Sequence, residues 1–449
     1  MSEHPLSDSP GLTLVATALY PDRPTQLLAL AELTPPEVAL RSRPLMDMTL
    51  VIDRSSSMAG PRLAAAVEAV RQVGQRFGSA DLMTVVAFDR QARVVARPAP
   101  VTQEWVEDVV RRLTALGVGH LTNIEDGLRQ AIFSASRGGL PGAARTVVLV
   151  SDGFASTGMQ KDEQLVSLAR EVHGLGLVLH TVGVGEQFDE GLLSAMAVAG
   201  GGRFAYARHD LDLVEAVQTI VSGEANLVAD RAVLRLALGD AVKRYEVVHR
   251  LPVHLHEQVL EVTLGRLHLG QPRPVLLKLD LDPAGDEPVV ARVAYYRPGA
   301  AEGALPAGLL TEPLVIAVGE AREAAAARIG AAWIPLRVAR AMEEIWKLGT
   351  ATSPDEVRAG VEAAVLYART APPEFYASAE AVDAVGRLMV IAKEIASGGQ
   401  VSSHLARRLS SDVTNIFTVG AGVRAGGEVE GWGHWGAGSC RLGDGHTQY

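Results

Sequence analysis

Cysteine is almost missing from this sequence, which contains Cys440 alone among 449 residues. A single cysteine excludes an internal disulfide framework and any cysteine-rich zinc site. The first residues, MSEHPLSDSPG, lack both the basic segment and the apolar core of a secretory signal. No apolar run reaches the length of a membrane-spanning helix. These absences predict a cytoplasmic protein that is soluble and has no membrane span.

An excess of positive charge is also lacking. The chain has 42 Lys and Arg residues against 52 Asp and Glu residues, for a formal net charge of -10. Proteins that bind nucleic acid through a basic field need the opposite balance, so no nucleic-acid partner is expected. The phosphate-binding pattern G-x-x-x-x-G-K-S/T is absent as well. ATP chemistry by this chain is therefore not expected.

A regular alternation of strands and helices runs from Thr49 to Val221. The strand candidates are short apolar runs such as MTLVI and TVVLVS, and the segments between them repeat apolar residues every three or four positions. Continuous apolar strands separated by helices are typical of a mostly parallel sheet that is covered on both faces. The sequence therefore predicts a doubly wound, Rossmann-like α/β domain over residues 47–223.

The two flanks of this domain have the pattern of β-structure. Residues 11–46 contain two strand-like segments around a turn, and residues 224–312 contain several more, broken by Gly, Pro and Asp. Two strands are too few to fold alone, so we predict one β-sandwich built from both flanks, into which the α/β domain is inserted. Two separate β-pieces are the alternative. Helical periodicity predicts a helical region over residues 313–412, followed by a Gly-rich tail over residues 413–449.

Carboxylates and hydroxyls follow the predicted core strands. Asp53 directly follows the apolar run in MTLVIDRSSSMAG, and Ser55 and Ser57 come next. Asp152 follows another core strand in TVVLVSDG, and Thr122 stands just before a helix in GHLTNIEDGL. Because the carboxyl ends of parallel strands share one edge of a sheet, all of these side chains are expected in one crevice.

Two carboxylates and three hydroxyls make an all-oxygen set. Such a set suits a hard divalent cation, Mg²⁺ in the first place and Mn²⁺ or Ca²⁺ as substitutes. The two carboxylates roughly neutralise the ion, whereas the hydroxyls fill coordination positions without adding negative charge. The ion then keeps an affinity for one more anionic oxygen, which an Asp or Glu of a protein partner can supply. The pattern predicts metal-bridged protein binding.

This constellation resembles the von Willebrand factor A (VWA) domain family, whose metal-ion-dependent adhesion motif (MIDAS) reads D-x-S-x-S, then Thr, then Asp. All five motif positions are filled in the family's order, by Asp53, Ser55, Ser57, Thr122 and Asp152. The segments FDRQARVV and GGRFAYARHDLDLVEAVQTI also match, and the resemblance covers residues 47–223. Leu121 stands where a small residue is common in the family. The flanking layout is similar to that of bacterial cytoplasmic VWA proteins.

The resemblance implies a metal-binding, non-enzymatic interaction module in which Asp152 often acts through water. Three alternatives stay open for the site: serines that only cap a helix, a hydrolytic triad of Ser55 or Ser57 with His120 and Asp152, and a zinc site on the strand-like run with His254 and His256. The alternative function is a scaffold or adaptor subunit of a larger, ATPase-linked assembly with a regulatory metal. A metal-dependent hydrolase is less favoured, because no general base is evident. The sequence leaves the oligomeric state open.

Overall fold

The computed structural model describes residues 10–20, 22–35, 44–140, 142–152, 154–185, 188–207, 210–285, 288–296, 305–306, 308–347, 354–398 and 440–441. The chain divides into two compact units. The first unit is α/β and takes in the described residues from 44 to 230, and the second, with the described residues before and after that range, is β-sandwich and helices.

The α/β unit is built on one six-stranded sheet in the order β5-β4-β3-β6-β7-β8. Every neighbouring pair is parallel except β4 and β5, which form an antiparallel hairpin over the segment FDRQARVV. The strands are β3 (Met46–Asp53), β4 (Leu82–Phe88), β5 (Ala92–Pro100), β6 (Ala144–Ser151), β7 (Val178–Val184) and β8 (Gly201–Ala207).

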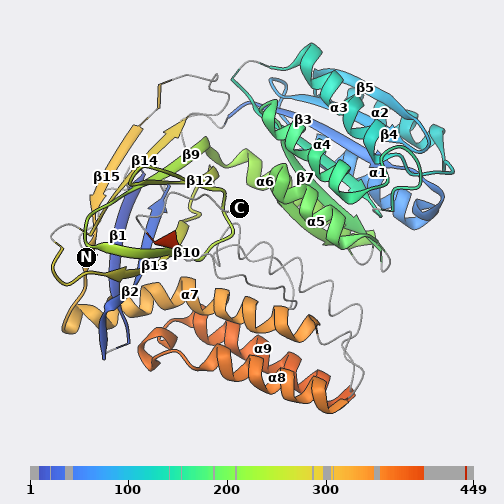
Figure 1. Cartoon of the computed structure of the whole chain (residues 1–449). Helices are drawn as coiled ribbons and strands as arrows, with labels where there is room; N and C mark the ends of the chain where they lie inside the picture. The colour runs from blue at the N-terminus through green and yellow to red at the C-terminus, as the bar shows by residue number, and fades with distance from the viewer. Residues whose placement is uncertain are drawn as a thin grey trace, which may run out of the picture. The chain divides into compact units, whose positions relative to one another are not determined.

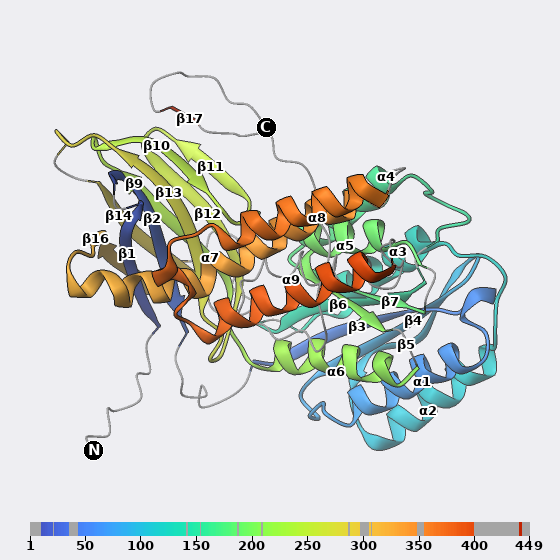
Figure 2. The same cartoon turned by 90° about the horizontal axis from the view of Figure 1, so that it is seen from below.

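Helices cover both faces of this sheet (Figure 2). Leu50 and Ile52 of β3 belong to the core formed with α1, α2 and α6, whereas Val51 belongs to the core formed with α3, α4 and α5. This division follows from the alternation of side chains along a strand. The helices are α1 (Pro61–Gly74), α2 (Gln103–Leu116), α3 (Ile124–Gly138), α4 (Asp162–Gly174), α5 (Glu190–Ala199) and α6 (Asp210–Ala225).

The second unit contains two further sheets, in the orders β16-β1-β2-β13-β10-β17 and β11-β12-β9-β14-β15. Strand β2, from before the α/β unit, pairs antiparallel with β13, from after it, with Ala29 opposite Leu277. Strands from both flanks thus share one sheet (Figure 1), and the predicted fold class, a doubly wound α/β domain inserted in a β-sandwich and followed by helices, is confirmed. The strands are β1 (Gly11–Tyr20), β2 (Arg23–Thr34), β9 (Leu227–Leu238), β10 (Val242–Val247), β11 (Val253–His256), β12 (Val259–His268), β13 (Arg273–Leu281), β14 (Val289–Tyr296), β15 (Gly308–Pro313), β16 (Val315–Ile316) and β17 (Cys440–Arg441).

Helices α7 (Glu320–Lys347), α8 (Pro354–Arg369) and α9 (Ala379–Gly398) complete this unit. Helix α7 continues through Pro335 and packs against the sheet that contains β1, β2 and β13. Trp333 of α7 meets Phe375 edge to face, with 5.2 Å between ring centroids. In the part of the chain that the structure describes, no helix combines the length and the apolar character needed to cross a membrane.

The C-terminal part of the sequence is described only in part. The predicted helical segment that runs from residue 399 to residue 412 lies outside the described residues, and so does the Gly-rich tail except for Cys440–Arg441. These two residues pair antiparallel with β10. The domain boundaries predicted from the sequence stay predictions.

A buried histidine gives the sandwich unit a specific dependence on pH. His249 is 4% exposed, and its Nδ1 accepts a hydrogen bond from the backbone N–H of Leu276, at 3.1 Å. Burial and the nearby Arg273 guanidinium lower the pKa of His249 from 6.5 to about 3. The unfolded chain therefore takes up a proton at His249 near its ordinary pKa, and the folded chain does not. The contribution of His249 to stability is therefore lost as the pH falls from its ordinary pKa of 6.5 toward its folded pKa of about 3, by about 1.4 kcal/mol per pH unit.

We expect His249→Gln to lose less stability than wild type between about pH 7 and about pH 5, by about 2 kcal/mol, because glutamine takes up no proton. Urea denaturation at the two pH values measures this difference. His254→Gln, at an exposed position on β11, is the control and should follow wild type. Identical pH dependence of His249→Gln and wild type would contradict the prediction.

Candidate functional site

The carboxyl ends of β3 and β6 lie side by side in the sheet, and each is followed by polar residues of the predicted site. Asp53 is the last residue of β3, and Asp152 follows Ser151, the last residue of β6. Asp53 is 0% exposed and Asp152 is 2% exposed. The structure therefore brings two carboxylates, 99 positions apart in the chain, to the same edge as the parallel-sheet argument predicts.

Asp53 is held at both carboxylate oxygens. Its Oδ1 accepts from the backbone N–H of Ser55, at 2.8 Å, and its Oδ2 accepts from the hydroxyl of Ser151, at 2.6 Å. Burial nevertheless raises the pKa of Asp53 to about 7, and the negative charge of Asp152 adds to the increase. Removing a carboxylate from water disfavours its ionised form more than these hydrogen bonds favour it. A positive charge placed beside Asp53 and Asp152 would therefore favour the ionised form of these carboxylates.

The serines connect Asp152 to the loop that follows Asp53. The hydroxyl oxygens of Ser55 and Ser57 are 3.0 Å apart and hydrogen-bonded. The hydroxyl of Ser57 also hydrogen-bonds to Asp152, whose pKa is raised by burial and held back by this bond and by the charge of Arg62. Arg62 in turn donates to the backbone carbonyl of Ser57, at 3.0 Å. Four of the five predicted site residues are thereby linked to one another.

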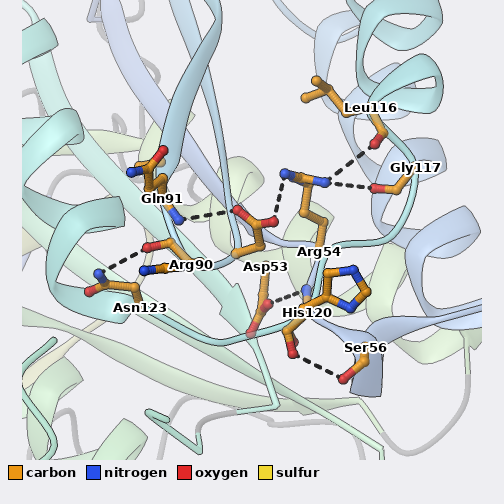
Figure 3. Close-up of polar contacts among 12 residues, drawn as sticks. Asp53, Arg54, Ser56, Arg90, Gln91, Leu116, Gly117, His120 and Asn123 are labelled. Atoms are coloured by element: carbon orange, nitrogen blue, oxygen red, sulfur yellow. Dashed lines mark hydrogen bonds and ion pairs between the residues drawn. The ribbon is translucent and has the colours of Figure 1, made fainter. Parts of the chain in front are cut away.

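Thr122 is joined to the other four residues only through the bonds of its loop. The residue is 5% exposed, and its backbone N–H donates to the hydroxyl of Ser156 at 2.9 Å while its carbonyl accepts from the N–H of Ser156 at 3.0 Å. Asn123 then caps α3 by accepting from the N–H of Asp126, at 3.1 Å. The hydroxyl of Ser56 donates to the carbonyl of His120, at 3.3 Å, and so joins the loop of Thr122 to that of Asp53 (Figure 3).

A buried arginine fixes the same two loops, and sequence reasoning missed it. Arg54 forms an ion pair with Asp89, with 2.8 Å between Nη2 and Oδ2, and donates to the carbonyls of Leu116 and Gly117, both at 3.3 Å (Figure 3). The carbonyl of Arg54 accepts from the N–H of Gly119, at 2.6 Å. We call this set the Arg54 clamp. Its sequence signal is the arginine at the first variable position of D-x-S-x-S.

Glycine is required at position 119 because the clamp leaves no room for a side chain. A Cβ built there would lie 2.2 Å from Oδ2 and 2.3 Å from Cβ of Asp89. Asp89 is held in this position, because its Oδ1 accepts from the N–H of Gln91 at 3.1 Å and its carbonyl accepts from the N–H of Asn123 at 2.9 Å. The loop between α2 and α3 therefore lies so close to the residues at the end of β3 that only glycine fits at position 119.

The donor chemistry of the crevice fits a hard divalent cation. The site offers two carboxylates and a set of hydroxyls, and burial raises the pKa of both carboxyl groups. A nearby divalent ion would reverse this effect, because opposite charge favours the ionised form. Among the residues that the structure describes, no group of three or more His, Cys, Asp or Glu is suited to a metal.

Two of the alternatives from the sequence, the hydrolytic triad and the zinc site, gain no support from the geometry. The hydroxyl of Ser57 bonds to Asp152, and His120 meets the site loop through its backbone carbonyl, which is not the arrangement of a hydrolytic triad. Strand β11, with His254 and His256, is exposed along its whole length. Glu257, next in the chain, has a φ of 54° in the turn to β12. These residues form an exposed edge strand and a tight turn.

A doubly wound α/β unit with paired aspartates and hydroxyls at the carboxyl edge of its sheet defines a recognisable class of domain. Residues 47–220 match the family model of the von Willebrand factor type A domain. This part of the chain is therefore a VWA domain, as the motif indicates.

Related sequences extend the likeness beyond this domain. An uncharacterised protein of Synechocystis sp. is 26% identical over 284 residues, which are 61% of this chain and 66% of that protein. Inter-alpha-trypsin inhibitor heavy chain H1 of Bos taurus is 24% identical over 226 residues, 48% of this chain and 24% of that one. The chain thus spans two thirds or less of the length of these curated relatives.

Two solved structures share the fold over nearly the whole chain. A von Willebrand factor type A protein from Catenulispora acidiphila has a TM-score of 0.68 at 15% identity and covers 95% of this chain and 99% of its own. The ArnB paralog VWA2 from Sulfolobus acidocaldarius has a TM-score of 0.53 at 15% identity, covering 92% and 98%. At these identities the likeness concerns the fold alone.

Proposed function

We propose that this protein is a metal-dependent protein-binding module and not an enzyme. Its VWA domain would hold Mg²⁺, or Mn²⁺ or Ca²⁺ in its place, through Asp53, Ser55, Ser57, Thr122 and Asp152. A bound divalent cation supplies one open coordination position for an anionic oxygen. That oxygen would come from an Asp or Glu of a protein partner, and VWA domains are typically protein-interaction modules. Its cytoplasmic location remains a prediction.

The carrying observation is the charge balance of the crevice. Two buried carboxylates at the same edge of the sheet have raised pKa values, the charge of Asp152 adds to the increase at Asp53, and the other oxygens belong to neutral hydroxyls. A divalent cation relieves the repulsion between the carboxylates without exceeding neutrality. A further carboxylate from outside is then attracted at short range, in a low-dielectric site where charge interactions are strong.

A scaffold or adaptor role in a larger, ATPase-linked assembly is the second candidate, and one observation favours it. A groove of about 500 Å³ is lined by residues of α8 and α9 and is mostly apolar. Leu366 of α8 and Met389 of α9, which both line it, are 62% and 42% exposed. Such a surface can carry a contact that needs no metal. A metal-dependent hydrolase has no comparable observation in its favour, and loss of a measured turnover in Asp53→Ala would be needed to revive it.

We expect the purified chain to bind synthetic peptides with a central Asp or Glu in Mg²⁺ and to release them in EDTA. Matched peptides with a central Asn should not bind, because the amide carries no charge. Asp152→Asn should weaken peptide binding by about 10-fold or more, as loss of a metal-site carboxylate does. Fluorescence anisotropy measures all of these affinities.

Asp162→Asn, at an exposed position in the first turn of α4, is the matched control and should bind as wild type does. Peptide binding that persists in EDTA would contradict the proposed function. The pull-down that separates it from the scaffold role compares Mg²⁺, EDTA and Asp53→Ala in Mg²⁺. Retention of the same proteins in all three conditions would favour the scaffold.

A further inference from the structure

Large apolar side chains are exposed on the loops that carry the candidate site. Phe154 is 55% exposed and stands two positions after Asp152, and Leu121 is 38% exposed and directly precedes Thr122. Val118, on the same loop as Leu121, is 44% exposed. We call Val118, Leu121 and Phe154 the apolar rim. Such residues are usually buried, and their exposure on the loops next to Thr122 and Asp152 requires a reason.

The two loops of the apolar rim are fastened to each other. Besides the two hydrogen bonds between Thr122 and Ser156, the N–H of Thr157 donates to the carbonyl of Thr122, at 3.3 Å. Gly158 has a φ of 74°, and a Cβ built there would lie 2.3 Å from Oδ1 of Asn123. The loop after β6 is therefore packed directly on the start of α3. Leu121 and Phe154 are presented by loops with defined positions.

The Arg54 clamp fixes the rest of the apolar rim. Val118 lies between Gly117, whose carbonyl accepts from Arg54, and Gly119, whose N–H donates to the carbonyl of Arg54. The loops of all three rim residues are thus tied by hydrogen bonds to each other or to the residue that follows Asp53. A rigid apolar surface loses little conformational entropy when it binds a partner.

We propose that the apolar rim selects partners in which the acidic residue is flanked by large apolar side chains. This inference rests on the proposed function and specifies its partner: a protein segment that places an Asp or Glu at the crevice and its neighbours against the rim. Apolar contacts around a charged contact exclude water from it and strengthen it, as in the centres of protein interfaces. The rim also penalises acidic segments with polar neighbours, which leave it exposed.

The probes are synthetic peptides that differ only at three central positions: Leu-Asp-Leu, Ser-Asp-Ser and Leu-Asn-Leu. In Mg²⁺ we expect wild type to bind the Leu-Asp-Leu peptide about 10-fold more tightly than the Ser-Asp-Ser peptide. The Leu-Asn-Leu peptide should not bind, since it lacks the carboxylate. Phe154→Ser and Leu121→Ser should reduce the preference to near unity while Mn²⁺ binding, measured by calorimetry, stays at the wild-type affinity.

Phe133→Ser is the matched control, because Phe133 on α3 is 51% exposed and lies outside the apolar rim. It should keep the full preference for Leu-Asp-Leu. Equal, Mg²⁺-dependent binding of both acidic peptides to wild type would overturn the inference and leave the proposed function standing. Equal loss of preference in Phe133→Ser and Phe154→Ser would also overturn it. Absence of Mg²⁺-dependent binding to every acidic peptide would overturn both proposals.

Discussion

Asp53→Asn is expected to reduce divalent-cation binding by about 100-fold or more and to make the metal-free protein more stable. Both effects have one cause, the ionised carboxylate that β3 buries at its end. Its pKa rises from 3.8 in the unfolded chain to about 7 in the fold. Between these values the folded state holds the extra proton, so the contribution of Asp53 to stability falls as the pH rises through the window. At about pH 8 a neutral asparagine therefore avoids a cost of about 4 kcal/mol.

The matched control is Asp47→Asn, six positions earlier on the same strand. Asp47 is also buried, at 4% exposure, but it lies at the other end of β3 and faces Arg145, with 3.7 Å between Oδ2 and Nε. Burial raises the pKa of Asp47 too, although Arg145 opposes the increase, so we expect this neutral variant also to be stabilised relative to wild type as the pH rises, and to bind metal as wild type does. Calorimetric titration with Mn²⁺ and thermal unfolding in EDTA give both readouts. Wild-type Mn²⁺ affinity in Asp53→Asn would remove Asp53 from the site.

The location of the two aspartates was predictable, because it depends on short-range patterns and one rule of sheet topology. MTLVI and TVVLVS are continuous apolar runs, and such runs pair in parallel when helices separate them. Once β3 and β6 are neighbours, Asp53 and Asp152 have to share an edge. The fold class was predictable for the same reason, and the structure confirms it. Whether the five oxygens hold a metal is a chemical question that the fold leaves as a prediction.

The Arg54 clamp was not predictable, because it joins segments that no periodicity relates. Asp89 lies in the turn between β4 and β5, and its distance from Arg54 depends on how that hairpin is bent. The requirement for glycine at position 119 appears only when Asp89 is in place.

The Arg54 clamp and the two carboxylates have different roles in the proposed site. Asp53 and Asp152 supply charge, and their own loops give them positions at the edge of the sheet. Thr122 belongs to the loop between α2 and α3, which is held by hydrogen bonds to Arg54, Ser56 and Ser156. A ligand set is effective only when surrounding bonds hold it near its binding geometry. Residues that touch no metal should therefore control its affinity.

Arg54→Met is expected to lower Mn²⁺ affinity by about 10- to 100-fold although all five predicted ligands remain. The substitution keeps the apolar stem of the side chain but removes the charge facing Asp89 and the donors to Leu116 and Gly117. The side chains of Arg54 and Asp89 are only 8% and 16% exposed. Breaking such a pair destabilises a fold by about 3 kcal/mol. Arg54→Lys should recover part of the stability but little of the affinity, because an ammonium group cannot reproduce the planar fork of the guanidinium.

Arg145→Met is the matched control for Arg54→Met. Arg145 faces Asp47 and donates to the carbonyl of Ala135, so its loss should also destabilise the domain, at the end of the strands away from the site. If stability alone governed metal binding, the two variants would lose Mn²⁺ affinity in proportion to their loss of stability. If the clamp positions Thr122, only Arg54→Met loses affinity at a temperature where both variants are folded.

Gly119→Ala gives the independent check, because it displaces the same loop from Asp89 while Arg54 keeps its charge. Wild-type affinity in both Arg54→Met and Gly119→Ala would show that the clamp stabilises the domain without serving its metal site.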